Sequence, residues 1–329
     1  MISSNTLGTS LSHSCSTGLS LITSGGISIS LLFSVVAGSV HGISGGLLIA
    51  LPYLFPFFIL LALLEDTGYL PRLAVFLDNS MHWLGLHGYA IIPTLLGLGC
   101  NVPGVMATRI LESRRQRFIT ATLISVAVPC AALQAMIIGL VGKRGIGPVL
   151  LVYSILFLTW MSIGLVLRYT TRGFLPELLI EIPPYRTPSF PALCSKLWMR
   201  VLGFLKEALP VVMAAIFIIN LLYALEGFEQ IAHLTAPVVT RLWGLPEEAI
   251  VPLLIGILRK DVAIGMFAPL ELTTHQLITG SVILSMFFPC IATAVILFRE
   301  LKLLDGLKAI GVMLLAVLIV GTAVNFFLP

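Results

Sequence analysis

Charged residues are scarce in this chain. Of its 329 residues only 10% are charged, whereas 58% are hydrophobic and the mean hydropathy is +1.05. A soluble domain usually carries about 25% charged residues, so this protein cannot expose its whole surface to water. No cluster of Lys and Arg forms the basic patch that nucleic acid requires, and the composition therefore excludes a nucleic-acid partner.

Several motifs of enzymes and cofactor sites are also missing. The chain has no His-Glu-x-x-His zinc motif, no phosphate-binding GxxxxGK[ST] loop and no GxGxxG dinucleotide fingerprint. Its five cysteines show no disulfide or zinc-finger spacing. Residues 1–26 are rich in Ser, Thr and Gly without Lys or Arg, which predicts a flexible leader and no secretory signal. We expect a protein that is not an enzyme and holds no tightly bound cofactor.

Long apolar segments dominate instead, and each is long enough to cross a hydrocarbon core of about 30 Å. They cover about 45–64, 117–141, 147–168, 205–225, 277–297 and 307–328, with a weaker candidate at 27–41. Two further segments, 90–108 and 248–270, are interrupted by Gly, Pro and polar residues. Broken helices are tolerated at membrane depth only where they are buried in protein or line a cavity. The pattern predicts an all-α polytopic membrane protein with broken, re-entrant helices.

The positive charges indicate the topology. If both broken segments re-enter without crossing, the inner loops are 65–117, 169–206 and 298–308. Together with Arg168, at the end of the segment before the second loop, these loops hold most of the 19 Lys and Arg residues. They are Arg72, Arg109, Arg114, Arg115, Arg117, Arg168, Arg172, Arg186, Lys196, Arg200, Lys206, Arg299, Lys302 and Lys308. Cytoplasmic loops are enriched in Lys and Arg, so we favour this arrangement. A crossing by the first broken segment alone fits nearly as well.

The chain also contains an internal repeat. An offset of 159 residues matches Gly85-Leu86 with Gly244-Leu245, Pro93 with Pro252, Gly97 with Gly256, and Ile119-Thr120 with Ile278-Thr279. After one extra residue in the second half, Pro129-Cys130 matches Pro289-Cys290. Chance alignment of apolar sequence would match Leu and Ile, not this set of Gly, Pro and Cys.

The repeat and the topology together predict the domain organisation. Three crossings separate the segment at 45–64 from its counterpart at 205–225, and an odd number gives the two copies opposite orientations. Inverted repeats with discontinuous helices are a recurrent transporter architecture, with the site at the repeat interface. We assign residues 27–168 to the first repeat half, 169–204 to a cytoplasmic connector and 205–329 to the second half.

The first broken segment reads LLGLGCNVPGVMATR. Gly97 and Gly99 allow close backbone approach, Pro103 removes a hydrogen-bond donor, and Asn101 can cap a half-helix. Cys100 therefore lies at an unwound point, where its sulfur and the freed carbonyl groups can face an ion. The alternative is a small, inert buried cysteine.

Other candidate ligands lie at matching or charged positions. Cys130 and Cys290 each follow a proline at corresponding places in the two halves, and sulfur suits borderline and soft metals. Asp261 follows Arg259 and Lys260 in the second broken segment, where a charge costs about 2.5–3.5 kcal/mol unless it is solvated. It is a candidate cation-attracting group, or else the end of a short helix at the interface. Glu65-Asp66 has two readings, a cation entry point or a solvated helix end.

These segments resemble a known family. LLEDTGYLPRLAVFLD and GLGCNVPGVMATRILESRRQRF are similar to the first gate region of the ferrous iron transport protein B family. ELLIEIPPYRTPSF resembles that family's connector, and GILRKDVAIGMF with MFFPCIATAVIL resembles its second gate. The likeness covers roughly residues 42 to 329. It departs from the family after Cys130, where relatives have a Ser-Cys pair closely followed by Arg and this chain reads VPCAALQAM.

The resemblance implies a function. It implies a permease for Fe²⁺, as transported substrate, in the plasma membrane of a prokaryote, with the paired gates forming the pore. It implies Cys100, Asn101 and Cys290 as gate residues and leaves the role of Cys130 open. Family members begin with a GTPase domain that is missing from this sequence, so we expect that domain on a separate chain or in a truncated part, and a homo-oligomer is possible. The alternatives are another divalent metal or nucleoside-like substrate, or a scaffold that regulates a partner GTPase.

Overall fold

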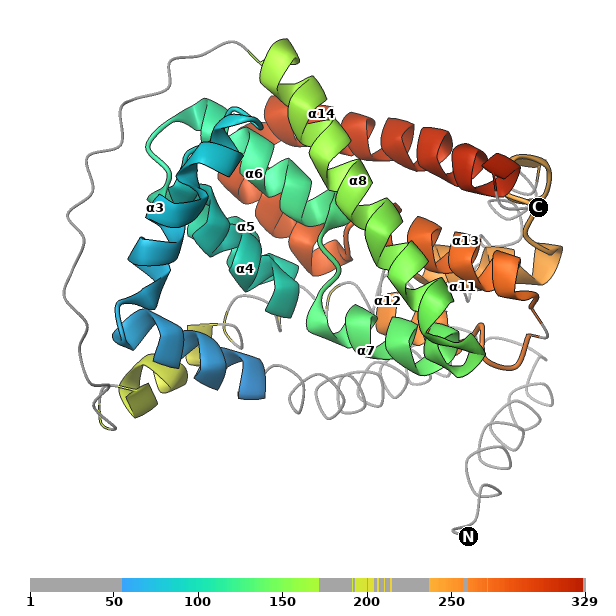
Figure 1. The fold of residues 1–329 in the computed structure, drawn as a ribbon, viewed down its shortest axis with the longest axis horizontal. Coiled ribbons are helices and arrows are strands. Elements are labelled where there is room, and N and C mark those ends of the chain that lie inside the picture. Colours follow the sequence, from blue (N-terminus) through green and yellow to red (C-terminus); the bar gives the residue numbers. More distant parts are fainter. Residues whose placement is uncertain are drawn as a thin grey trace, which may run out of the picture.

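The structure is a computed structural model in which every regular element of the described residues is a helix (Figure 1). It describes residues 55–171, 191, 193–199, 201–203, 206, 210, 214, 237–256, 260–270 and 272–327. Residues 55–66 form the first described helix. The elements that follow are α3 (Tyr69–His82), η1 (Gly88–Ala90), α4 (Ile91–Gly99), α5 (Asn101–Ala107), η2 (Thr108–Ile110), α6 (Arg114–Ala127), α7 (Ala131–Val141), η3 (Gly142–Arg144), α8 (Ile146–Thr170), η4 (Val238–Leu242), η5 (Glu247–Ala249), α11 (Ile250–Gly256), α12 (Lys260–Gly265), α13 (Thr274–Met286) and α14 (Ile291–Phe327).

The predicted apolar segments coincide with these helices. Three stretches are long and apolar enough to cross a membrane: Arg114–Arg144, Ile146–Thr170 and Thr274–Phe327. They contain the predicted segments 117–141, 147–168, 277–297 and 307–328. The leader, the weak candidate at 27–41, most of 205–225 and the first part of 45–64 lie outside the described residues, as does most of the connector. The proposed domain boundaries stay predictions.

The helices repeat with the period that the sequence indicates. Gly85 and Gly244 both adopt a left-handed conformation, with φ of 70° and 65°. A short 3₁₀ turn then leads into α4 in the first half and into α11 in the second. The two turns are 159 residues apart in sequence, and so are the starts of the two helices. The offset becomes 160 residues at the helix caps, where Ser113 caps α6 and Thr273 caps α13. The extra residue therefore lies in the connection before these helices, and the match of Ile119-Thr120 with Ile278-Thr279 is one residue out of register.

The long helix α14 contains a kink where the sequence predicts a loop at 298–308. Lys302 has φ 65° and ψ 161°, a non-helical conformation between two helical stretches. The chain thus turns at a single residue and remains helical on both sides. The non-helical backbone at Lys302 divides the 54-residue apolar stretch Thr274–Phe327, which is far longer than the span of about 20 residues needed for one crossing.

Ion pairs join the three predicted inner loops to one another. Asp66 pairs with Lys196 at 2.9 Å, which joins the first loop to the connector. Arg109 forms an ion pair with Glu300, and Arg114 approaches Asp305 at 2.7 Å, which joins the first loop to the α14 kink. These contacts agree with the grouping predicted from the positive charges. The side of the membrane on which these loops lie stays a prediction.

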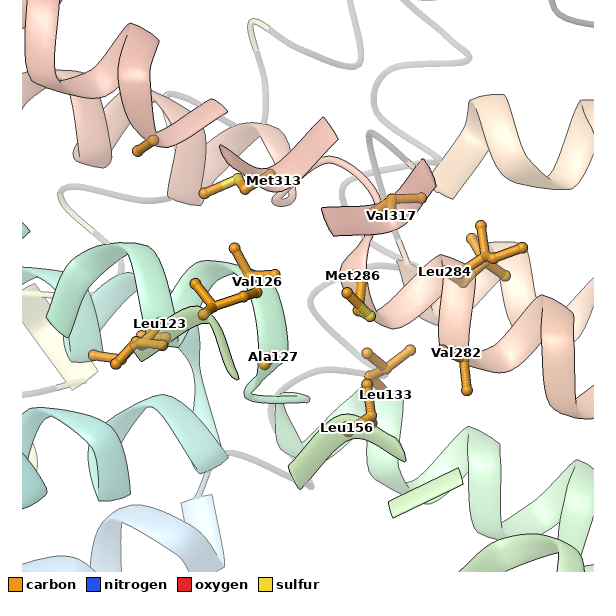
Figure 2. Close-up of a cluster of buried hydrophobic side chains, with 14 of the residues drawn as sticks. Leu123, Val126, Ala127, Leu133, Leu156, Val282, Leu284, Met286, Met313 and Val317 are labelled. Carbon is orange, nitrogen blue, oxygen red and sulfur yellow. The ribbon is translucent and has the colours of Figure 1, made fainter. Parts of the chain in front are cut away.

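Apolar side chains of both halves pack at the centre of the bundle (Figure 2). Leu123 and Val126 of α6, Leu133 of α7, and Met286 of α13 are buried in one cluster. Met313 of α14 belongs to the same cluster. Since side chains from helices of both halves pack in this one cluster, the repeats share one core and are not two separate domains.

The outer surface of the long helices is apolar as well. In α8 only 28% of the most apolar stretch is buried inside the protein. Its exposed residues include Leu150 (61%), Phe157 (61%) and Leu158 (64%). Soluble monomers rarely expose so large a continuous apolar face. The fold is therefore that of an all-α polytopic membrane protein whose outer face suits lipid.

Candidate functional site: a centre of broken helices

The first broken segment folds back on itself at Cys100. This residue is extended, with φ −151° and ψ 130°, between the end of α4 and the start of α5. A Cβ atom on Gly104 would lie 2.8 Å from the Cα of Gly97 and 3.1 Å from the Pro93 carbonyl oxygen. Contacts across such sequence distances require that α4 and α5 lie side by side as a helical hairpin. Glycine at both positions permits this approach.

This hairpin begins and ends at the same end of the bundle. Arg168 donates a hydrogen bond from Nη1 to the Trp83 carbonyl oxygen, which precedes the hairpin, at 2.9 Å. Its own carbonyl oxygen accepts one from Arg115 Nη2, which follows the hairpin, at 2.9 Å. The nine residues of α4 span about 13.5 Å, less than half of a hydrocarbon core. The break predicted in residues 90–108 is therefore a helical hairpin with Cys100 at its tip, a shape that a re-entrant segment requires, and its re-entry into the membrane stays a prediction.

Two further helix breaks occur where the sequence reasoning expected continuous segments. The predicted helix 117–141 is interrupted between α6 and α7, at Val128–Cys130. The predicted helix 277–297 is interrupted between α13 and α14 at residues 287–290. Proline lacks a backbone N–H and disfavours helical geometry in the residue before it. Pro129 and Pro289 carried this signal, which the length of the apolar segments concealed.

Each of the three cysteines directly precedes a half-helix. Cys100 is the N-cap residue of α5, Cys130 is the N-cap residue of α7, and Cys290 stands just before α14. Cys290 Sγ lies 3.0 Å from Thr293 Oγ1 in the first turn of α14. The cysteines therefore occupy equivalent structural positions at three different breaks.

The fold brings the three breaks together. The half-helices on either side of the breaks pack against one another: α5 against α14, and α4 and α12 against α7. Lys260 stands at the start of α12. Gln134 of α7 donates from Nε2 to the carbonyl oxygens of Leu98, at 3.3 Å, and Pro129, at 2.7 Å, and so connects two of the breaks. We refer to Cys100, Cys130, Cys290 and Lys260 as the thiol centre.

The thiol centre is not a closed metal site in this conformation. Among the described residues, one group of three ligand side chains has all its ligand atoms within 4.8 Å of one another, and it does not include a cysteine. An ion in the thiol centre would therefore contact the sulfur atoms in succession, or after the half-helices move together.

Lys260 is a buried basic residue at this centre. The residue is 6% exposed, and its Nζ donates a hydrogen bond to the Ser285 carbonyl oxygen at 2.8 Å, near the end of α13. A buried ammonium group is costly unless it is paired or hydrogen-bonded. The sequence reasoning noted Lys260 as an interrupting charge and selected its neighbour Asp261. The backbone of Asp261 lies in α12, but its side chain is outside the described part of the structure, so its cation-attracting role stays a prediction.

Asn101 does not cap its helix, contrary to expectation. It is the first residue of α5, and the N-cap position belongs to Cys100. Asn101 is 7% exposed, and its Oδ1 atom is buried with no hydrogen-bond partner among the described residues. A buried amide oxygen without a partner costs about 1–3 kcal/mol. Next to Cys100, this oxygen fits an additional ion ligand.

The adjacent acids Glu65 and Asp66 lie at the end of the first described helix, and Glu65 shares a cavity wall with Leu96 and Val102, which flank the break at Cys100. Asp66 is held by its ion pair with Lys196, whose Nζ donates to Oδ1 at 2.9 Å. Glu65 lines an apolar cavity of about 500 Å³ whose walls include Met106 and Tyr89. Their cation-entry role stays a prediction.

One cluster is not predicted by any sequence motif. Asp78, His82 and His87 approach one another at the end of α3 and the loop after it. Asp78 and His82 are four residues apart, a spacing that places them on one face of a helix. His87 comes from beyond a turn, so the three residues match no known histidine motif.

These features define the class of protein: an all-α membrane protein built from two Gate repeats. The Gate family, described as nucleoside recognition, matches residues 47–144 and 205–304, which together make up more than half of the chain. The family described as ferrous iron transport protein B C terminus matches residues 149–200. The chain belongs to the ferrous iron transport protein B family and corresponds to its membrane part.

Curated relatives agree with this assignment. The chain is 31% identical over 192 residues to the Fe(2+) transport protein A/Fe(2+) transporter FeoB fusion protein of Porphyromonas gingivalis, covering 56% of this chain and 22% of the relative. It is 30% identical over 248 residues to Fe(2+) transporter FeoB of Escherichia coli, covering 68% and 32%. It is 28% identical over 315 residues to Fe(2+) transporter FeoB of Methanocaldococcus jannaschii, covering 87% and 46%.

The chain therefore spans less than half the length of these relatives. No solved structure matches it.

Proposed function

We propose that this chain is the permease part of a ferrous iron uptake system in the plasma membrane of a prokaryote. Fe²⁺ is the transported substrate, and it passes the helix breaks at Cys100 and Cys290 with Cys130 beside them. The observation that carries the proposal is the convergence of three cysteines, each in front of a half-helix, from both repeats. The names of the curated relatives support Fe²⁺ as the ion.

The chemistry of the centre agrees with a divalent transition metal. Sulfur ligands favour borderline and soft ions over Mg²⁺ and Ca²⁺, which prefer oxygen. The Asn101 amide oxygen adds a neutral ligand beside Cys100. The absence of a closed, short-range thiol cage suits transport, because an ion that is held too tightly does not leave.

The nucleoside alternative has less structural support. Near the Cys290 break, the rings of Trp243 and Phe287 pack edge to face with centroids 6.2 Å apart. Trp243 is only 3% exposed. A nucleobase needs an accessible aromatic face for stacking, which Trp243 does not offer.

A GTPase in trans is part of the proposal, as is assembly of several copies of the chain. Both rest on the resemblance to the family. If a GTPase drives transport, the purified chain will show little flux alone and more flux when the partner is supplied.

Fe²⁺ uptake into proteoliposomes under reducing conditions tests the proposal, with the full chain and its partner GTPase. We expect Cys100→Ser and Cys290→Ser each to reduce uptake about tenfold or more, since even outer-shell changes at metal sites cost about 10–100-fold. Cys194→Ser is the matched control, because Cys194 is exposed and distant in sequence from the breaks.

The outcomes separate the alternatives. Unchanged uptake in both variants would remove the thiol pathway but leave the permease. Absence of metal-dependent flux even with the GTPase present would overturn the permease and favour a regulatory scaffold. Transport of a labelled nucleoside without Fe²⁺ would favour the solute alternative.

A further inference from the structure

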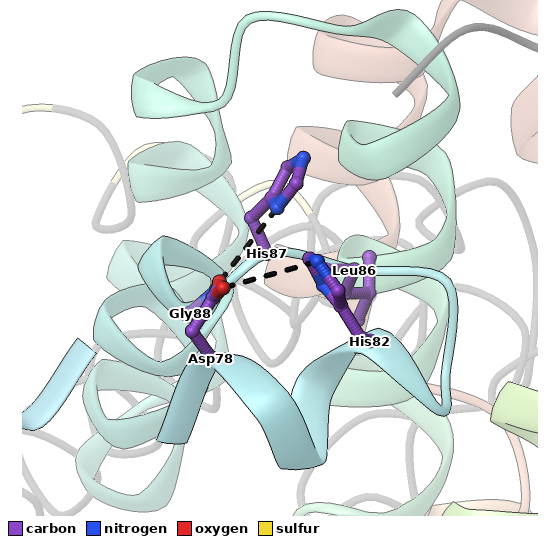
Figure 3. Close-up of polar contacts among 5 residues, drawn as sticks. All are labelled: Asp78, His82, Leu86, His87 and Gly88. Carbon is purple, nitrogen blue, oxygen red and sulfur yellow. Dashed lines mark hydrogen bonds and ion pairs between the residues drawn. The ribbon is translucent and has the colours of Figure 1, made fainter. Parts of the chain in front are cut away.

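We propose that Asp78, His82 and His87 form a binding site for a divalent first-row transition metal ion at the water-facing edge of the protein. The site is separate from the thiol centre, and the inference does not depend on Fe²⁺ transport. Figure 3 shows the two imidazole rings and the carboxylate group facing one another. The ligand atoms of all three residues lie within 4.8 Å of one another.

The hydrogen bonds of His82 direct a lone pair at the carboxylate. Its Nδ1 lies 3.1 Å from the Leu86 carbonyl oxygen, which can only accept, so Nδ1 carries the hydrogen. In the neutral ring, Nε2 then carries the lone pair, and it faces Asp78 Oδ2 at 3.8 Å. A proton or a metal ion between these two electron-rich atoms would make their approach favourable. A histidine that donates its other N–H to a backbone carbonyl is the usual arrangement of a metal ligand.

His87 supplies the second independent observation. The residue is 6% exposed, and neither ring nitrogen has a hydrogen-bond partner among the described residues. Its Nδ1 lies 3.6 Å from Asp78 Oδ1, beyond hydrogen-bond range. Buried polar atoms usually find a partner, and an unpartnered one suggests an ion or a functional role. A metal ion beside Asp78 would satisfy this nitrogen.

The backbone after α3 is built to hold these side chains. Gly85 turns the chain with φ 70°. A Cβ atom on Gly88 would lie 1.8 Å from the Ala74 carbonyl oxygen, so only glycine permits the loop to cross α3 this closely. As a result the Gly88 N–H donates to Asp78 Oδ1 at 2.7 Å and orients the carboxylate. Asp78 is thus positioned whether or not an ion is bound.

The distances are longer than those of metal coordination. Metal–ligand bonds of about 2.1 Å place neighbouring ligand atoms about 3.0–3.4 Å apart. The observed 3.6 and 3.8 Å involve different oxygens of Asp78, and the three ligand atoms lie within 4.8 Å of one another, so binding an ion requires the side chains to close by up to about 1.5 Å. The His82 side chain is 50% exposed and can rotate to provide this closure. Two histidines and one carboxylate, with the remaining positions open to water, suit Fe²⁺, Co²⁺, Mn²⁺ or Zn²⁺.

The site lies at the charged end of the bundle. His82 directly precedes Trp83, whose carbonyl oxygen accepts the hydrogen bond from Arg168. Helix α4, about 13.5 Å long, runs from this loop to Cys100. A metal ion held by Asp78 is therefore at the aqueous edge and outside the path between the half-helices.

Anaerobic titration of the full chain in detergent with Co²⁺ tests the inference. When Cys100, Cys130 and Cys290 are replaced by serine, we expect one Co²⁺ per chain with weak d–d absorption and without the intense thiolate-to-cobalt band. In the unsubstituted chain we expect the same d–d absorption, and any Co²⁺ at the thiol centre is reported separately by the band. His82→Gln should weaken Co²⁺ binding at this site by more than about tenfold, as loss of a ligand costs at least as much as loss of an outer-shell partner. His82 is exposed, so this variant leaves the fold intact.

Two further variants sharpen the test. Asp78→Asn keeps an oxygen for the Gly88 N–H and removes the charge, and we expect the same loss of Co²⁺ binding. His275→Gln removes a histidine of α13 outside the cluster and should leave binding unchanged. Co²⁺ binding to His82→Gln with the affinity of the unsubstituted protein would overturn the inference. The inference would also be overturned if all bound Co²⁺ showed the thiolate-to-cobalt band.

Discussion

The two broken segments share the same arrangement of two half-helices around a break, yet their half-helices pack differently. In the first, α4 and α5 contact each other through Gly97 and Gly104. In the second, the equivalent positions are Gly256 and Ala263, so a methyl group stands where the first has Gly104; a Cβ on Gly256 would lie 3.4 Å from the Ala263 Cβ and 2.5 Å from Leu284 Cδ2. The first hairpin therefore packs backbone against backbone, whereas the second accommodates the methyl group of Ala263.

The larger difference concerns charge. Asn101 begins α5 and Lys260 begins α12, 159 residues later, so the two occupy the same place in the repeat. One offers an unpartnered amide oxygen, and the other donates an ammonium hydrogen to the Ser285 carbonyl oxygen. A duplicated fold thus carries an amide group in one half where the other has an amine. If an ion passes the thiol centre as proposed, we expect it to bind nearer the first half than the second.

The strongest test of this comparison concerns packing. We expect Gly104→Ala to destabilise the protein by about 2–3 kcal/mol, because its Cβ meets backbone atoms that cannot rotate away. Ala263→Gly should cost only about 1 kcal/mol, as expected for glycine in a helix. Thermal unfolding in detergent measures both, and Gly139→Ala is the control, since its Cβ would have no atom within 4 Å. Equal effects at positions 104 and 263 would show that the two hairpins pack alike.

The next test removes the charge difference. Lys260→Asn makes the second hairpin resemble the first. We expect metal affinity at the thiol centre to rise about tenfold, since a nearby like charge costs a cation about 1–4 kcal/mol. Titration of the thiolate-to-cobalt band measures this, with the exposed Lys143→Asn as control. Weaker binding instead would mean that Lys260 acts by stabilising the thiolates.

The helix caps provide a smaller contrast. Ser113 accepts a hydrogen bond from the Gln116 N–H in the first half. Thr273 does the same with Gln276, whose side chain also bonds back to the Thr273 N–H at 3.1 Å, a complete capping box. Replacing a cap by alanine costs about 1 kcal/mol, and we expect Thr273→Ala to exceed Ser113→Ala. Hydrogen exchange in the first turns of α6 and α13 measures the difference, and the reverse order would contradict it.

The smallest effects should come from the ion pairs that join the two halves at the charged end. Arg109 is 53% exposed and Arg114 is 65% exposed. Exposed pairs contribute at most about 1 kcal/mol, so Arg109→Gln and Arg114→Gln should lower the melting temperature only slightly. High salt should remove even this difference. A large, salt-independent loss of stability would mean that these pairs hold the halves together.

Much of the molecule follows from local sequence. The apolar segments, the first break at Cys100 and the matching glycines Gly85 and Gly244 were all predictable, because span length and backbone preference act over a few residues. The breaks after Pro129 and Pro289 carried a signal of the same kind. They are not predicted because the apolar residues around each proline form a continuous segment that is long enough for one membrane crossing.

Other features depend on the fold as a whole. The cluster of Asp78, His82 and His87 forms only because Gly88 crosses α3 tightly enough to place an imidazole over the carboxylate. Lys260 and Asn101 become a contrasting pair only when both halves meet around the same cysteines.

By itself, the sequence determined that this protein is a helical membrane protein, that it is built from two copies of one unit, and which family it resembles. Those properties arise from composition, periodicity and local backbone restriction. Only the tertiary structure decided that the helix breaks converge and which polar atoms remain without partners there. Convergence depends on packing between half-helices distant in sequence, and no local preference encodes which of them will meet.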